Sequence, residues 1–127
     1  MADAVLDASA VLALLNHEDG ADQVLPRLEG AAISAVNLCE VAGKLVDAGM
    51  PIEVAEHALS ALLTDVRELD SESAYLAAAL RAQRGGSALS LGDRACLALG
   101  QALAAPVLTA DRRWTEASDS VDVIVIR

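Results

Sequence analysis

Aromatic residues are almost absent from this 127-residue chain, which has no phenylalanine, one tryptophan and one tyrosine. Hydrophobic residues nevertheless make up 54% of the sequence, a share that excludes a disordered chain. We therefore expect a single folded domain over residues 1–127, because this length is enough for one core. That core must be built from alanine, leucine and valine.

Basic residues are also scarce, since 9 lysines and arginines stand against 19 acids and give a formal net charge of −10. This balance argues against a protein that binds nucleic acid through a broad basic surface. It does not exclude an enzyme that reaches a phosphate group through a bound metal ion. It also suits a protein that binds a basic partner.

The two cysteines, Cys39 and Cys96, lie in apolar stretches and belong to no CxxC or Cys/His pattern. We expect buried, reduced thiols and a cytoplasmic protein. The N-terminus lacks the early basic residues of a signal peptide, and no apolar run reaches the roughly 18 residues of a membrane span. The two histidines, His17 and His57, have no metal-ligand spacing and are expected on the surface.

Short apolar runs alternate with longer stretches of helical character. Strands are expected at 4–6, 31–33, 66–69, 107–109 and 123–126, and helices at 9–16, 21–28, 35–48, 51–63, 71–84 and 91–104. Ser34 is the expected N-cap of the third helix, and Gly49 is expected to end it. The alternation predicts an α/β protein: a three-layer α/β/α sandwich around a mainly parallel sheet of about five strands.

Four carboxylates are embedded in apolar sequence: Asp7, Glu40, Asp93 and Asp111. Isolated acids beside a core are costly to desolvate, and they repel one another if they meet without a partner. Asp7 follows the first expected strand and Asp111 follows the fourth, and ligands bind at the carboxyl ends of parallel strands. We therefore expect the four acids to converge and to hold Mg²⁺ or Mn²⁺.

Each acid also has an ordinary structural interpretation. Asp7 and Asp111 are placed to cap the helices that follow them, and Asp93 fits a capping box with the serine three residues before it. Glu40 is spaced for an exposed ion pair with Lys44, four residues on. Two acids at strand ends and two near helix N-termini, all at one edge, favour a shared metal site over four unrelated roles.

Three polar neighbours, Ser9, Thr109 and Asn37, are expected to hydrogen-bond a carboxylate or a metal-bound water. Basic side chains also flank the acids: Arg94, Arg112, Arg113 and Lys44. These side chains either contact phosphate or compensate local charge, and the sequence favours neither role. Asp119, in the segment after the fourth acid, is a further candidate for the site.

Three segments resemble the PIN-domain ribonucleases, and among these the VapC-type toxins of prokaryotic toxin–antitoxin pairs: VLDASAVLALL, ISAVNLCEVAGKL and LSLGDRACLALGQALAAPVLTADRRW. The similarity runs nearly the whole length and is least specific between residues 51 and 86. It implies a PIN-like fold with its acidic site at the four carboxylates, and with Thr109 and Ser9 as hydroxyl-bearing neighbours. It also implies Mg²⁺- or Mn²⁺-dependent RNA cleavage, homodimerisation and inhibition by a small VapB-type antitoxin.

The expected reaction is hydrolysis by a metal-activated water, which leaves 5′-phosphate and 3′-hydroxyl ends because the 2′-hydroxyl is not the nucleophile. Asp7, after the expected middle strand, is the expected central ligand. An inactive PIN-like interaction domain is one alternative. A receiver-type phospho-acceptor domain is another, but it needs a lysine after the fifth strand, and the only lysine is Lys44. A phosphatase with a DxD motif is a third, and here Ser9 replaces its second aspartate.

Overall fold

The structure is a computed structural model that describes residues 2–116 and 120–127. Within these residues, five strands form one sheet in the order β3-β2-β1-β4-β5, and every pair of neighbours is parallel. The strands are β1 (Ala4–Leu6), β2 (Ala31–Ser34), β3 (Val66–Arg67), β4 (Val107–Thr109) and β5 (Val123–Val125). The predicted parallel sheet is confirmed, and the strand that precedes Asp7 is its central one.

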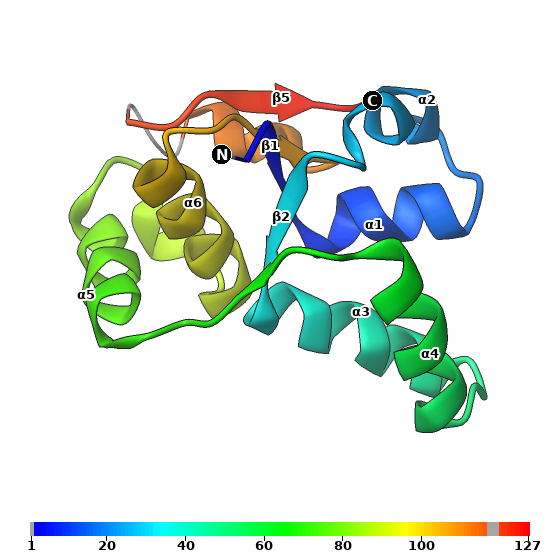
Figure 1. Ribbon diagram of the computed structural model, residues 1–127. Coiled ribbons are helices and arrows are strands. Elements are labelled where there is room, and N and C mark those ends of the chain that lie inside the picture. The colour runs from blue at the N-terminus through cyan, green and yellow to red at the C-terminus, as the bar shows by residue number, and fades with distance from the viewer. Residues whose placement is uncertain (1, 117–119) are drawn as a thin grey trace.

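Helices cover both faces of this sheet (Figure 1). The α-helices are α1 (Ala8–Leu15), α2 (Ala21–Val24), α3 (Ala35–Asp47), α4 (Ile52–Leu62), α5 (Ser71–Ala79) and α6 (Leu91–Leu103). Short 3₁₀ helices are η1 (Leu25–Arg27), η2 (Leu80–Ala82), η3 (Gly86–Ala88) and η4 (Arg112–Glu116). Figure 1 shows α5 and α6 on one side of the sheet and α1 to α4 on the other, so the predicted three-layer α/β/α architecture is confirmed.

The core is divided by the sheet because successive side chains of a strand point to opposite faces. In β1, Ala4 and Leu6 pack against α1, α3 and α4, whereas Val5 packs against α6 and Trp114 on the other face. All three β1 residues are fully buried. The central strand thus reads as continuously apolar, as expected for a parallel strand covered on both faces.

Helix boundaries follow local capping chemistry. The Ser34 hydroxyl accepts a hydrogen bond from the N–H of Val36 at 3.2 Å, and the Asp70 carboxylate accepts one from Ser73 at 2.8 Å. Gly49 follows α3 with a φ of +100°, a left-handed conformation that favours glycine. These contacts fix where α3 and α5 start, and therefore where α3 presents its first turns to the sheet edge.

Three elements are clearly shorter than the sequence predicts. The predicted helix 21–28 is α-helical only over Ala21–Val24 and continues as the 3₁₀ helix η1. The third strand has only Val66 and Arg67, because its partner strand β2 ends at Ser34 and turns into α3. The predicted helix 71–84 ends at Ala79 and continues as a 3₁₀ turn. The backbone at Gly86 packs directly on the Leu80 carbonyl, so the chain must turn back at that point.

Cys39 was expected to be buried, and this prediction is wrong, because its side chain is exposed on α3. Asn37 and Val41, four residues apart, face inward, and Cys39 lies about 200° around the helix from Asn37. Cys96 is buried, as predicted, and His17 and His57 are exposed. None of the helices in the described part of the chain combines the length and apolar character that crossing a membrane requires.

Candidate active site

Asp7 stands immediately after the central strand β1 and is the N-cap of α1. Its Oδ1 accepts a hydrogen bond from the backbone N–H of Ala10 at 2.8 Å, the contact expected of a capping aspartate. The capping interpretation of Asp7 is therefore confirmed. It does not compete with a role in a site, since it uses only one of the two carboxylate oxygens.

Two hydroxyl groups hold the same carboxylate. Ser9 Oγ donates to Asp7 Oδ1 at 2.7 Å, and Thr109 Oγ1 donates to Asp7 Oδ2 at 2.6 Å. Each hydroxyl in turn accepts a backbone N–H from the segment after β4: Ala110 donates to Ser9 at 2.8 Å, and Asp111 donates to Thr109 at 3.1 Å. Both hydroxyl protons are thus directed at Asp7, which stabilises its ionised form.

Burial acts in the opposite direction on Asp7, whose residue is only 5% exposed. Desolvation raises the pKa of its carboxyl group, and the negative charge of Asp93 adds to that rise. The hydrogen bonds from Thr109, Ser9 and Ala10 oppose the rise without cancelling it. Asp7 is therefore a buried carboxylate whose hydrogen-bond donors are all neutral and do not offset the cost of its burial.

Glu40 lies on α3 and reaches towards the first turn of α6. Its Oε1 accepts a hydrogen bond from the Asn37 amide at 2.8 Å. A Cβ atom added at Gly92 would lie 2.7 Å from Glu40 Oε2, so the carboxylate packs directly on the α6 backbone. The predicted ion pair with Lys44 is not found among the described residues.

Asp93, in the first turn of α6, forms the predicted capping box. The Ser90 hydroxyl accepts a hydrogen bond from the N–H of Asp93 at 3.1 Å, and Asp93 Oδ2 accepts one from the N–H of Ser90 at 2.9 Å. The second oxygen of Asp93 stays outside this box. Burial first, and then the negative charges of Asp7, Asp93 and Glu40, raise the pKa of the buried Cys96 thiol.

Asp111, two residues after β4, is engaged by its neighbour Arg113. Arg113 donates two side-chain hydrogen bonds to it, at 2.8 and 3.1 Å, and a backbone N–H at 3.0 Å. These bonds lower the pKa of the Asp111 carboxyl group. The indole N–H of Trp114 faces the same carboxylate and contributes to this shift, although its geometry falls short of a hydrogen bond.

The four acids line one pocket of about 250 Å³ at the carboxyl edge of the sheet. Its other walls are Ala8, Ser9, Leu12, Asn37 and Trp114. The pocket lies where β1 and β4 meet, and the crossovers leave in opposite directions from this point, as at the ligand sites of other parallel sheets. The convergence predicted from the sequence is thus present in the fold.

Trp114 and Gly92 both shape the pocket, and neither was singled out from the sequence. Trp114 is 1% exposed and closes one wall, and Gly92 leaves the space that Glu40 occupies. A glycine within a helical pattern often marks a close approach, so Gly92 carried a signal that the sequence interpretation did not use. For Trp114, the only signal in the sequence is that it is the single tryptophan of the chain.

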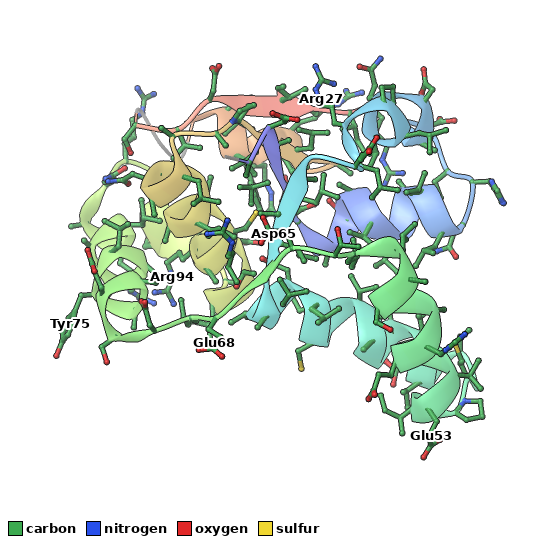
Figure 2. The ribbon with its side chains drawn as sticks, viewed as in Figure 1. Arg27, Glu53, Asp65, Glu68, Tyr75 and Arg94 are labelled. Atoms are coloured by element: carbon green, nitrogen blue, oxygen red, sulfur yellow. The ribbon has the colours of Figure 1, made fainter. Side chains whose placement is uncertain are left out.

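The four basic residues for which the sequence favours neither phosphate contact nor charge compensation do not line this pocket. Arg94 lies between α5 and α6 in Figure 2 and donates to the Ala77 carbonyl at 3.4 Å. Arg112 donates to the Arg127 carbonyl at 3.0 Å, and Lys44 is exposed on α3. Arg113 pairs with Asp111 at the rim of the pocket and compensates the negative charge of that carboxylate. Asp119, the further candidate for the site, lies outside the described residues.

The pocket residues fit a divalent cation in their chemistry. Carboxylate oxygens are the ligands that Mg²⁺ and Mn²⁺ prefer, and the carbonyl oxygen of Asn37 is buried here with no hydrogen-bond partner among the described residues. As the side chains stand, no three acids of the described chain are close enough to share one ion. Asp93 is turned onto the N–H of Ser90 and Asp111 onto Arg113, so these two carboxylates must rotate before they can share an ion with Asp7 and Glu40.

Comparison with known proteins places this arrangement in context. A family model described as PIN domain matches residues 4–119. A toxin–antitoxin complex from Klebsiella pneumoniae has a chain with 20% sequence identity and a TM-score of 0.75, with 98% of each chain covered. DNA-bound VapBC from Salmonella typhimurium gives 15% identity, a TM-score of 0.75 and 98% coverage of each chain. VapBC-5 from Mycobacterium tuberculosis has 22% sequence identity and a TM-score of 0.64, with 98% of each chain covered. A search of curated protein sequences finds no significant match.

Proposed function

Because the chain belongs to the PIN-domain family, we propose that it is an endoribonuclease that depends on Mg²⁺ or Mn²⁺. The observation that carries this proposal is the single pocket lined by Asp7, Glu40, Asp93 and Asp111 at the carboxyl edge of the sheet. Four acids with one partly compensating arginine leave a negative potential that attracts cations. This explains how an acidic protein with a net charge of −10 would still engage a polyanion.

In the proposed reaction, Asp7 would hold the cation most directly, because it is the most buried of the four acids and accepts three hydrogen bonds. Glu40, Asp93 and Asp111 would complete the set of ligands from three different segments. A bound divalent cation supplies neutralisation of the phosphate charge and a lower pKa for a coordinated water. The hydroxyls of Ser9 and Thr109 favour the ionised form of Asp7 and orient its carboxylate before a cation binds.

Water attacks the phosphorus, and the bond between phosphorus and the 3′-oxygen breaks. The attacking water loses a proton, and the leaving 3′-oxygen gains one. The products therefore carry 5′-phosphate and 3′-hydroxyl ends. No described residue of the pocket is a histidine or lysine that would activate the 2′-hydroxyl, so products with 2′,3′-cyclic phosphate ends would contradict this route.

The test is cleavage of total RNA by the purified chain, freed of any partner, with Mg²⁺ or Mn²⁺ and then with EDTA. Asp7→Asn is the informative variant, and Asp47→Asn is its matched control, because Asp47 is exposed at the far end of α3. Cleavage by the wild type and by Asp47→Asn, but neither in EDTA nor by Asp7→Asn, supports the proposal. Cleavage that persists in EDTA, or in Asp7→Asn, refutes it.

We further propose that a small antitoxin encoded alongside inhibits the chain, and that the chain forms a homodimer. The proposed antitoxin rests on two structural neighbours, one named as a toxin–antitoxin complex and one as a member of a family of toxin–antitoxin systems, each of which covers 98% of the chain. A net charge of −10 favours a basic inhibitory segment. Co-expression with the adjacent small open reading frame should yield a stable complex that does not cleave RNA. Light scattering after size-exclusion chromatography should give twice the mass of 13.1 kDa for the chain alone.

A further inference from the structure

We propose that Asn37 is a positioning residue that fixes the Glu40 carboxylate against the first turn of α6, and so sets its spacing from Asp93. The inference rests on the proposed metal-dependent site, because it concerns how two of its acids are held. It goes beyond that proposal by giving a polar residue between two helices a defined task.

The Asn37 side chain is 1% exposed, and its amide nitrogen donates two hydrogen bonds. One runs to Glu40 Oε1 at 2.8 Å, within α3, and the other runs to the Gly92 carbonyl at 3.1 Å, in α6. A single amide group therefore joins segments that are 55 residues apart in the sequence. Gly92 directly precedes Asp93, so the bridge ends beside the second acid.

The orientation of the amide follows from its partners. A carboxylate and a backbone carbonyl only accept hydrogen bonds, so the nitrogen of Asn37 must face both of them. This leaves Asn37 Oδ1 buried without a hydrogen-bond partner among the described residues. An orphaned carbonyl destabilises a fold, and such groups call for a reason other than stability. Holding Glu40 is that reason.

Gly92 makes this bridge possible. Any side chain there would place its Cβ against the Glu40 carboxylate, at 2.7 Å from both Cδ and Oε2. Glu40 is thus enclosed between the Asn37 amide and the α6 backbone, although its residue is exposed overall. Asp93 is tied to the same turn by its capping box. The turn that begins at Ser90 therefore carries Asp93 and anchors Glu40.

Metal ligands are commonly oriented by hydrogen bonds from residues behind them, and loss of such a partner typically lowers metal affinity about 10- to 100-fold. Asn37→Ala should accordingly weaken Mn²⁺ binding about 10-fold. It should also lower kcat for RNA cleavage while KM for RNA changes little, because Asn37 contacts an acid rather than the substrate. The matched control is Asn16→Ala, an exposed asparagine at the end of α1.

The test is a double-mutant cycle of Asn37→Ala and Glu40→Gln, with Mn²⁺ affinity from titration calorimetry and thermal melts in EDTA. If Asn37 acts through Glu40, its substitution weakens Mn²⁺ binding in the wild type but adds less than twofold in Glu40→Gln. An equal loss in both backgrounds overturns the proposal. So does unchanged Mn²⁺ affinity with a lower melting temperature, which would make Asn37 a packing residue only.

The same experiment separates this inference from the proposed nuclease. Suppose that the wild type cleaves RNA, but that Asn37→Ala and Glu40→Gln have additive effects on Mn²⁺ affinity. This result would refute the role of Asn37 and leave the proposed nuclease standing. Mn²⁺ binding without RNA cleavage would refute the nuclease, while a non-additive cycle would still support the role of Asn37. A wild type that binds no Mn²⁺ would refute both.

Discussion

The inner and outer acids of the pocket are held in opposite ways. Asp7 is buried, it receives only neutral donors, and its pKa is raised. Asp111 lies at the rim, its side chain is 28% exposed, and Arg113 lowers its pKa. Two residues of the same type thus respond differently, because desolvation dominates inside the pocket and a cationic partner dominates at its edge.

This difference has a functional meaning. A carboxylate that is costly to keep charged gains most from a cation, whereas one already neutralised by an arginine gains least. The inner acid is also fixed by three donors before any ligand binds, whereas Asp111 must exchange Arg113 for a new partner. We therefore expect the substitutions below to have larger effects at Asp7 and its donors than at Asp111 and Arg113.

The largest expected effect is on catalysis. Asp7→Asn should lower kcat/KM for RNA cleavage about 1000-fold, which equals about 4 kcal/mol of transition-state stabilisation. Asp111→Asn should lower it only about 10-fold, equal to about 1.4 kcal/mol, because its charge is already compensated. The measurement is initial cleavage rates of one defined RNA in Mn²⁺. Equal losses in the two variants would remove the distinction between inner and outer acids.

The donors to Asp7 should contribute strongly to stability. Thr109→Val keeps the shape of a side chain that is 0% exposed, but removes the bond to Asp7 Oδ2 and the acceptor for the Asp111 N–H. We expect a loss of about 2 kcal/mol in the free energy of unfolding, and about 1 kcal/mol for Ser9→Ala. Urea denaturation in EDTA measures both, with exposed Thr64→Val as the control. A neutral Thr109→Val would mean that water replaces the hydroxyl.

A smaller effect, of opposite sign, is expected when the charge of Asp7 is removed. A carboxyl group whose pKa is higher in the folded state destabilises the fold once pH exceeds its unfolded value of 3.8. The penalty is absent below that pH and grows until pH passes the folded pKa. In EDTA at neutral pH, Asp7→Asn should thus be more stable than the wild type, by on the order of 1 kcal/mol.

The difference between Asp7→Asn and the wild type should shrink as pH falls towards the unfolded pKa. Saturating Mn²⁺ should reverse the order, because the cation stabilises only the chain that binds it tightly. Melting temperatures from pH 4 to pH 8, with and without Mn²⁺, test both statements. A less stable Asp7→Asn in EDTA at every pH would mean that capping outweighs the cost of burial.

The position of the inner acid, Asp7, was easier to predict from the sequence than the contacts of the side chains at the pocket rim. Asp7 was identified because a parallel sheet brings its strand ends to one edge, and this depends only on the order of strands and helices. That both its capping role and its place in the pocket are present shows that the two interpretations were never exclusive. Asp93 repeats this lesson, with a capping box that leaves one oxygen outside it.

The positions of long side chains were not predictable in the same way. Arg94 neighbours Asp93 in the sequence but projects to α5, because successive residues of a helix point about 100° apart. Arg113 was one of four basic candidates, and only the turn after β4 brings it onto Asp111. Asn37 was a candidate, but its bridge to Gly92 depends on the tertiary packing of α3 against α6.

The smallest effect is expected at the rim. Arg113 is 80% exposed in its side chain, so its ion pair with Asp111 adds little to stability. Arg113→Ala should leave the melting temperature nearly unchanged, but should raise the pKa of Asp111 and tighten Mn²⁺ binding severalfold at low salt. Arg112→Ala is the control, since its guanidinium donates to the Arg127 carbonyl instead. Weaker Mn²⁺ binding in Arg113→Ala would contradict this, because it would mean that Asp111 needs Arg113 to hold it in place.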